Sequence, residues 1–154
     1  MKSNDSKIIN ELELLKLREQ LCFPIYLCSK EITGKYNELL KPIDLTYTQY
    51  VVMMYFWDKD SSNLKDISKA LLLDASTLSP IIKKLEAKGF LERRRLETDE
   101  RNLVISLTQK GVEVQEKALE TTGKVMEFFE FTPEETTTLR VLILKILEHS
   151  VDKF

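Results

Sequence analysis

The chain has 154 residues, a length typical of a single domain with its own buried core. Its hydrophobic share of 43% and charged share of 31% exclude an intrinsically disordered chain, and its apolar runs are too short to cross a membrane. The formal net charge is −2, but residues 61–110 carry more Lys and Arg than Asp and Glu. Because residues 1–5 do not resemble a secretory signal, we expect a cytoplasmic protein whose cysteines are reduced.

The N-terminal part of the chain is predicted to be helical. Apolar residues recur at spacings near three and four throughout residues 8–41. Pro24 interrupts this pattern, because proline cannot donate a hydrogen bond to the preceding turn. Either the helix kinks at Pro24, or a new helix begins with Pro24 in its first turn. A further helix is expected to start at a cap on Thr46 or Thr48 and to run to about Trp57.

A helix-turn-helix pattern occupies the middle of the chain. Residues 58–63 have the composition of a turn, residues 64–71 form a short amphipathic helix, and residues 74–86 form a longer helix that Asp74 caps. In this motif the second helix lies in the major groove of DNA, where small hydroxyls and lysines suit base edges and phosphates. The candidate DNA-contacting residues of this helix are Asp74, Ser76, Thr77, Ser79, Pro80, Lys83 and Lys84.

A β-hairpin is predicted directly after this motif. Two β-capable runs, residues 91–96 and 103–108, flank a charged turn and carry four arginines in and around them. Such a hairpin is the wing of a winged helix-turn-helix, and an arginine at its tip can reach the minor groove. Successive side chains of a strand alternate between its faces, so the neighbouring arginines cannot all face DNA. The candidate wing residues are Arg94, Asp99 and Arg101.

The C-terminal part is again predicted to be helical. Thr108 begins a long helix, and a break near residues 131–133 leads into a helix over residues 134–151 that is apolar on several sides. Such a helix must be buried on several sides, which favours a dimer interface built from both ends of the chain. We therefore expect one domain, residues 1–154, of mainly α class with a small β-hairpin wing. Its dimerisation helices would span about residues 8–45 and 109–154, and its winged helix-turn-helix DNA-binding region about residues 46–108.

Several of these residues resemble a known family. The wing pattern Asp99-x-Arg101-x-x-x-Ile105-x-Leu107-Thr108-x-x-Gly111, behind a helix-turn-helix, resembles the MarR family of winged-helix regulators. The runs Gln20-Leu21-Cys22-Phe23 and Leu45-Thr46-Tyr47-Thr48-Gln49-Tyr50 resemble the OhrR branch, which senses organic hydroperoxides. The resemblance implies a homodimeric repressor that leaves pseudo-palindromic operator DNA when an N-terminal cysteine is oxidised. It also implies that Asp99 pairs with an arginine and holds the shape of the wing.

The resemblance makes Cys22 the candidate redox sensor. It implies that Tyr36 and Tyr47 hydrogen-bond the Cys22 sulfur across the dimer, while Tyr26 lies one helical turn away. If a helix begins at Pro24, its dipole favours the thiolate of Cys22, and a thiolate reacts with peroxide to give sulfenic acid. The alternative is that Cys22 is a small buried apolar residue, as most cysteines are.

Cys28 lies six residues after Cys22, which places their Cα atoms about 9 Å apart along an intact helix, too far for a disulfide. Unwinding at Pro24, or contact between two subunits, would still permit a disulfide. We expect a one-cysteine sensor whose sulfenate is over-oxidised or trapped by a low-molecular-weight thiol. Lys84 stands where the OhrR branch commonly has an arginine, and lysine cannot contact guanine in bidentate fashion. Operator preference is therefore expected to differ.

Other functions stay open on the sequence. One is a MarR-type regulator that responds to a small phenolic ligand or to general thiol stress. A thiol peroxidase with Cys22 as nucleophile lacks a recognisable peroxidatic motif and leaves the hairpin unexplained. A helical partner-binding module would have no DNA role. We expect no enzymatic activity, no cofactor, no metal site and no membrane partner, since the chain has a single histidine and no phosphate-cradling glycine-rich loop.

Overall fold

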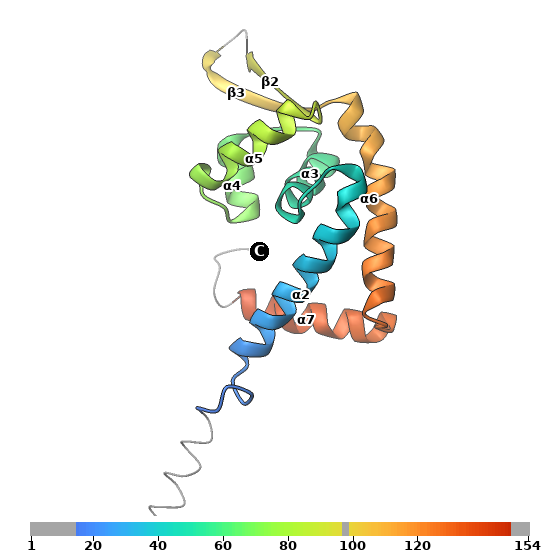
Figure 1. Cartoon of the computed structure of the whole chain (residues 1–154). Coiled ribbons are helices and arrows are strands. Elements are labelled where there is room, and N and C mark those ends of the chain that lie inside the picture. Colours follow the sequence, from blue (N-terminus) through green and yellow to red (C-terminus); the bar gives the residue numbers. More distant parts are fainter. Residues whose placement is uncertain (1–14, 97–98, 149–154) are drawn as a thin grey trace, which may run out of the picture.

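The computed structural model describes residues 15–96 and 99–148, without the side chains of residues 95–102. The described elements are mainly helices, with one small antiparallel sheet (Figure 1). In chain order they are α2 (Cys22–Leu40), the 3-10 helix η1 (Lys41–Ile43), α3 (Tyr47–Lys59), β1 (Ser61–Asn63), α4 (Leu64–Leu71), α5 (Ala75–Ala87), β2 (Leu91–Leu96), β3 (Asp99–Leu107), α6 (Gln109–Phe128) and α7 (Pro133–Glu148).

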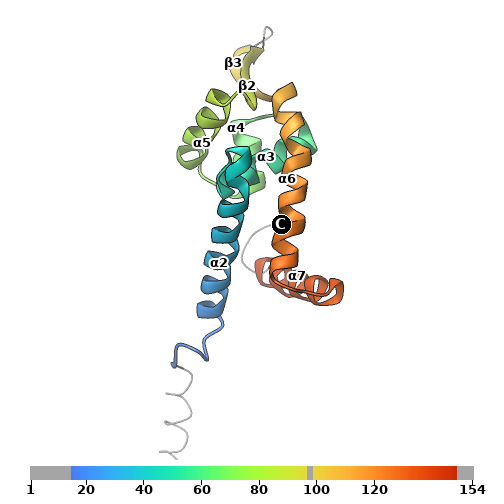
Figure 2. The same cartoon turned by 45° about the vertical axis from the view of Figure 1, so that its right-hand side comes forward.

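The helices and the sheet form a compact lobe with two long helices leading away from it. Helices α3, α4 and α5 pack together beside the sheet, while α2 and α6 extend from this lobe and α7 follows at an angle from the far end of α6 (Figures 1 and 2). The core lies in the lobe, because its largest fully buried side chains come mostly from these elements. They include Met53, Phe56, Ile67, Leu78, Ile82, Leu85, Leu91 and Ile105. The predicted mainly α winged helix-turn-helix is confirmed.

Helix α2 begins at Cys22, which decides between the two alternatives at Pro24. Pro24 is the third residue of α2, where its missing N–H leaves no hydrogen bond unmade. The amide of Ile25 donates to the carbonyl oxygen of Leu21 at 3.3 Å, which closes the first turn. Residues 15–21 form turns, so the expected helix over residues 8–41 is wrong there, and its residues 8–14 lie outside the described part.

Polar side chains fix the starts of the lobe helices. Thr46 caps α3 in a full capping box: its hydroxyl accepts from the Gln49 amide, and the Gln49 side chain accepts from the Thr46 amide. Asn63 caps α4 by accepting from the amide of Asp66 at 2.9 Å. Asp74 occupies the cap position of α5, but its side chain makes no capping hydrogen bond. The prediction of an Asp74 cap is therefore correct for the position and wrong for the interaction.

The sheet has three strands in the order β1-β3-β2, and both pairs are antiparallel. Ile105 of β3 lies opposite Ser62 on one side and Arg93 on the other, so β3 is the central strand. The turn predicted over residues 58–63 is wrong for residues 61–63, which form β1. The three residues Ser61, Ser62 and Asn63 have little intrinsic preference for a strand. These residues form a strand because the backbone of β3 lies beside them and offers hydrogen-bonding groups. The pattern of the sequence does not show that β3 lies there.

The C-terminal helices carry most of their apolar side chains exposed. Thr108 caps α6 as predicted, accepting from the amide of Gly111 at 3.1 Å. Helix α7 has no buried residue. Its exposed large apolar side chains are Leu139, Val141, Leu142, Ile143, Leu144 and Ile146. Within the described residues, no helix is both long enough and apolar enough to cross a lipid bilayer.

Candidate functional site

Helix α5 presents a polar face to solvent and an apolar face to the lobe. Leu78, Ile82 and Leu85 are buried against α3 and α4. Of the residues predicted to contact DNA, all but Ser79 are exposed: Asp74, Ser76, Thr77, Pro80, Lys83 and Lys84. The helix is therefore held by its apolar side while hydroxyls and two ammonium groups stay accessible, as a recognition helix requires.

Two residues of this polar face have backbone roles. The half-buried Ser79 hydroxyl donates to the carbonyl oxygen of Ala75 at 2.7 Å, so it is already engaged within the helix. Pro80 is the sixth residue of α5 and lacks the N–H that would pair with the Ser76 carbonyl oxygen. That oxygen is thus left without its usual helical donor.

The arginines of β2 have different surroundings. The guanidinium of Arg93 binds the carboxylate of Glu86 at the end of α5, with Nε donating to Oε2 at 2.8 Å. This hydrogen bond and the ion pair lower the pKa of Glu86 and raise that of Arg93. Arg94 is exposed and lies 2.8 Å from Glu92. The side chains of Asp99 and Arg101 lie outside the described residues, although their backbone belongs to β3.

Cys22 is exposed at the first position of α2. It lies among exposed apolar side chains, since Leu21 is 67% and Ile25 44% exposed. Tyr26, one turn further along the helix, is 62% exposed. The alternative of a small buried residue therefore does not describe Cys22 within this single chain.

Tyr36 and Tyr47 belong to a tyrosine cluster at the other end of α2. Tyr36 stacks on Tyr50 with ring centroids 5.5 Å apart, and the Tyr47 ring lies 5.3 Å from that of Tyr36. The Tyr50 hydroxyl shares a 2.7 Å hydrogen bond with Thr122 of α6. Burial, and then the neighbouring phenols, raise the pKa of both Tyr36 and Tyr47. Both phenols therefore stay protonated at neutral pH and are able to donate hydrogen bonds.

The structure does not bring Cys22, the predicted sensor, and these two tyrosines together in one chain. Fourteen residues of helix separate Cys22 from Tyr36, which is about 21 Å along the axis at 1.5 Å per residue. A hydrogen bond between them needs a second copy of the chain. Cys28 is also free and exposed, and α2 is unbroken between the two cysteines.

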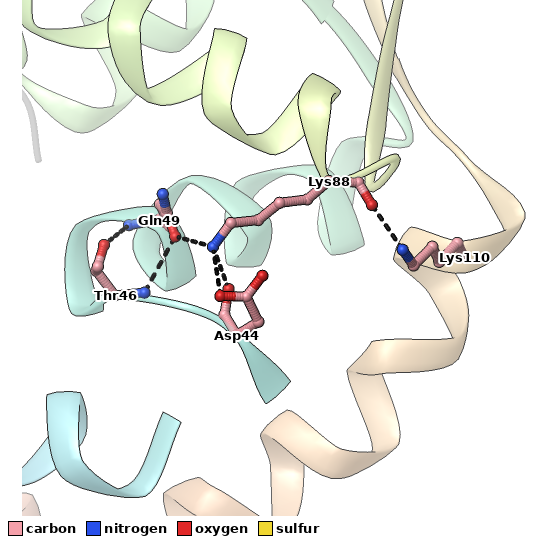
Figure 3. A network of polar contacts seen from close by, with 5 residues as sticks. All are labelled: Asp44, Thr46, Gln49, Lys88 and Lys110. Carbon is pink, nitrogen blue, oxygen red and sulfur yellow. Dashed lines mark hydrogen bonds and ion pairs between the residues drawn. The ribbon is translucent and has the colours of Figure 1, made fainter. Parts of the chain in front are cut away.

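A network of polar contacts at the end of α5 was not predicted. The ammonium of Lys88 reaches Asp44 and Gln49, and Lys110 reaches the Lys88 carbonyl oxygen (Figure 3). The spacing Thr46-x-x-Gln49 is a recognisable capping box and could have been found in the sequence. The pairing of Lys88 with Gln49 spans 39 residues and leaves no local signal.

The described part of the chain also contains an open cavity between α3 and α6. Its volume is about 610 Å³, and its lining includes Tyr50, Met54 and Trp57 of α3 and Leu119 and Thr122 of α6. No group of three His, Cys, Asp or Glu side chains able to hold a metal ion occurs among the described residues.

A three-helix lobe with a recognition helix and a three-stranded wing defines a winged helix-turn-helix protein. The family model described as "Transcriptional regulator SarA/Rot" matches residues 35–118. The chain belongs to this family of transcriptional regulators, on the OhrR-like side of the larger MarR group.

The similarity to individual relatives extends over nearly the whole length of this chain. The chain is 34% identical to the organic hydroperoxide resistance transcriptional regulator of Bacillus subtilis, over 90% of this chain and 95% of that protein. It is 42% identical to the regulator SarZ of Staphylococcus epidermidis, over 89% and 93% respectively. The crystal structure of AbfR from Staphylococcus epidermidis superimposes with a TM-score of 0.74 at 33% identity, covering 93% of this chain and 99% of AbfR. AbfR has also been solved bound to DNA in a reduced and in an overoxidised form.

Proposed function

We propose that this protein is a homodimeric transcriptional repressor that binds a pseudo-palindromic operator in its reduced state and releases it when an organic hydroperoxide oxidises Cys22. The observation that carries the proposal is the placement of Cys22. It stands exposed at the start of α2, on an apolar surface, in a chain whose recognition helix is free to meet DNA.

Dimerisation is supported by the exposed apolar surface of the terminal helices. Soluble monomers rarely expose continuous apolar patches larger than a few hundred Å². Here α2 exposes Leu21, Ile25 and Leu27, and α7 exposes apolar side chains around its whole circumference. A second copy with the same surfaces would cover both, as in a two-fold interface. It would also allow Tyr36 and Tyr47 of one copy to reach Cys22 of the other.

The oxidation step has a defined balance. The Cys22 thiolate attacks the outer oxygen of the hydroperoxide, the O–O bond breaks, and the products are a sulfenate and an alcohol. Protonated to sulfenic acid, it can then condense with a small thiol, forming a mixed disulfide and releasing water. Because AbfR is known on DNA in an overoxidised form, we infer that the bulky mixed disulfide releases this chain more completely than a sulfinate does.

Operator binding is supported by the exposed polar face of α5. Lys83 and Lys84 would attract phosphates, while Ser76 and Thr77 lie in the first turn, where a recognition helix meets base edges. Arg94, Asp99 and Arg101 are proposed as wing residues. The protein is proposed to be a stoichiometric sensor and not an enzyme, and to act in the cytoplasm.

The test is binding of the reduced protein to a labelled duplex from its own promoter region, repeated with cumene hydroperoxide alone and with a small thiol such as cysteine added. Cys22→Ser and Cys28→Ser are the matched variants. We expect release in wild type and Cys28→Ser, and retained binding in Cys22→Ser. Release that persists in Cys22→Ser would overturn the role of Cys22. Multiple turnovers of peroxide with thiol would instead favour a peroxidase.

A response to a small phenolic ligand is a second candidate. The observation in its favour is the cavity between α3 and α6, whose mixed polar and apolar lining includes the aromatic rings of Tyr50 and Trp57. Salicylate serves as a probe. If it reduces DNA affinity in Cys22→Ser and a Met54→Trp change that fills the cavity removes the effect, this second function stands. Unchanged DNA affinity at millimolar salicylate excludes it for this class of ligand.

A further inference from the structure

Lys88 stands at the point where the recognition helix ends. It is the C-cap residue of α5, and its amide donates to the Lys84 carbonyl oxygen at 3.1 Å. Gly89 follows with φ 75°, a left-handed conformation that turns the chain towards β2. The Lys88 side chain runs in the opposite direction, towards the junction between α2 and α3 (Figure 3).

The ammonium of Lys88 is fully satisfied at that junction. Its three N–H groups face three oxygen atoms: the Asp44 carbonyl oxygen, the Asp44 carboxylate at 3.0 Å and the Gln49 amide oxygen at 3.1 Å. The Lys88 side chain is only 24% exposed, so these contacts are partly shielded from water. The Asp44 carboxylate is itself 78% exposed, whereas Gln49 is buried, so the contact with the Gln49 amide oxygen and the one with the Asp44 carbonyl oxygen define the position of the ammonium.

One acceptor residue, Asp44, lies in the segment that joins α2 to α3, and the other, Gln49, lies in the first turn of α3. Asp44 ends η1 with φ 55° and ψ 42°, and Gln49 holds the capping box that starts α3. Asn37, near the end of α2, accepts from the Tyr47 amide at 2.7 Å. A continuous set of hydrogen bonds therefore runs from α2 through the start of α3 to the end of α5.

The same residue is also held from a third direction. The Lys110 ammonium, in the first turn of α6, donates to the Lys88 carbonyl oxygen at 2.7 Å. Thr108 donates to the carbonyl oxygen of Gly89 at 2.6 Å. The end of the recognition helix is thus tied directly to Asp44, to Gln49 of α3 and to the start of α6, and it is connected to α2 only through the contact between Tyr47 and Asn37.

We propose that Lys88 is a positioning residue that couples the orientation of the recognition helix to that of α2, and so transmits the state of Cys22 to the DNA-binding face. The inference rests on the proposed function above. Leu78, Ile82 and Leu85 hold α5 inside the lobe by apolar packing, which tolerates small rotations. The polar contacts of Lys88 restrict such rotations, because they join one end of α5 to Asp44 and Gln49, which lie directly after α2 in the chain.

The test compares Lys88→Met with wild type in the duplex-binding assay, using reduced protein and protein oxidised with cumene hydroperoxide in the presence of cysteine. Methionine keeps much of the length and apolar character of the side chain while removing its donors. The quantity measured is the ratio of the oxidised to the reduced Kd. We expect that ratio to fall about five-fold or more in Lys88→Met, with a much smaller change in the reduced Kd.

Lys117→Met is the matched control, because it removes the same charge from an exposed position of α6 that lies near the same junction. Its ratio is expected to equal that of wild type. Lys88→Arg keeps a charged donor and is expected to restore most of the ratio. Asp44→Asn tests the partner without disturbing the turn, because asparagine tolerates the left-handed conformation, and it is expected to lower the ratio as Lys88→Met does.

The outcomes separate the two proposals. A wild-type ratio of one overturns the proposed function and, with it, this inference. A normal wild-type ratio that is unchanged in both Lys88→Met and Asp44→Asn overturns the inference alone. Intact mass spectrometry verifies that Cys22 is oxidised to the same extent in every variant that is compared. If Lys88→Met fails to fold, as judged by its thermal unfolding, the comparison of Asp44→Asn with wild type decides.

Discussion

The carbonyl oxygen of Phe90 occupies the space that a β-carbon at Gly111 would need. The Leu107 side chain closes the same space. The Gly111 carbonyl oxygen in turn accepts from the Trp57 indole N–H at 2.9 Å. The beginning of α6 is therefore packed directly on the backbone at the start of the wing and tied to α3, which requires a residue without a side chain.

Gly111→Ala is expected to lower the free energy of unfolding by about 1–3 kcal/mol, because the added methyl group meets backbone that cannot move independently. Urea unfolding followed by circular dichroism measures the loss. Gly123→Ala, also within α6, is the control, since nothing lies within 4 Å of its new β-carbon. That change is expected to stabilise by up to about 1 kcal/mol through helix propensity. Equal effects of the two substitutions would contradict the packing argument.

Thr46→Ala is expected to destabilise the fold by about 1 kcal/mol, because it removes the hydroxyl that caps α3 and loosens the Gln49 side chain that completes the box. Thr48→Ala is the matched control: Thr48 is exposed and lies inside the helix, not at its cap. Thermal unfolding of the two variants distinguishes them. If Thr48→Ala lost more stability than Thr46→Ala, Thr46 would not be the residue that caps α3.

The ion pair between Glu86 and Arg93 predicts a pH dependence of stability. The hydrogen bond from Arg93 lowers the pKa of Glu86 below its ordinary value of 4.5, so its stabilising contribution is present above that pH and is lost as the pH falls through the lowered pKa. Glu86→Gln is therefore expected to be less stable than wild type near pH 7, by less than about 1 kcal/mol for such a partly exposed pair.

The measurement is urea unfolding of both proteins from about pH 7 down to about pH 3, provided that the fold persists there. The stability difference should shrink as the carboxyl becomes protonated. A difference that stays constant across this range would show that the variant loses packing and not the charge interaction.

The exposed apolar side chains of α7 predict a dimer interface, and charged residues introduced there should disrupt the dimer. Leu139 and Leu142 lie on one side of this helix and are 42% and 55% exposed in the single chain. Replacing both with glutamate is expected to convert a dimer to a monomer at micromolar concentration, as measured by light scattering, and to weaken DNA binding strongly. Thr137→Glu is the control on the same helix, because the exposed Thr137 is two positions from Leu139 and five from Leu142 and so lies on another side. An unchanged mass for the double variant would place the interface elsewhere.

The lysines of α5 predict a salt-dependent contribution to DNA affinity. Lys83→Ala and Lys84→Ala are each expected to weaken binding and to reduce the slope of log K against log salt by about 1 for each phosphate that the lysine neutralises in each copy. Lys124→Ala on α6 removes the same charge far from the recognition helix in sequence and is expected to leave the slope unchanged. Equal slopes for all three variants would exclude α5 as the phosphate-binding element.

Much of the fold follows from local patterns in the sequence. The periodicity of Leu64, Ile67 and Leu71 predicts α4. Pro24 predicts either a kink or a helix start, and the second alternative matches the start of α2. The two runs flanking the charged turn predict the wing. These features are set by side chains within one or two turns of each other, which is why a single sequence contains them.

The contacts of the predicted sensor site could not be predicted from local patterns in the sequence. Cys22 and the tyrosines were selected by resemblance, yet one chain holds Cys22 about 21 Å along α2 from Tyr36. The partnership of Tyr36 with Tyr50, and of Tyr50 with Thr122, joins residues far apart in the sequence. No spacing rule predicts contacts of this kind.

The sequence by itself determined where most of the helices lie, where the wing lies, which face of α5 is polar and which family the pattern resembles, since each of these depends on neighbouring residues. Only the tertiary structure decided that residues 61–63 form a strand, that Arg93 binds Glu86 and that Lys88 joins α5 to Asp44 and Gln49. The physical reason is that a strand edge, an ion pair or a buried ammonium takes its partner from whatever the folded chain places beside it.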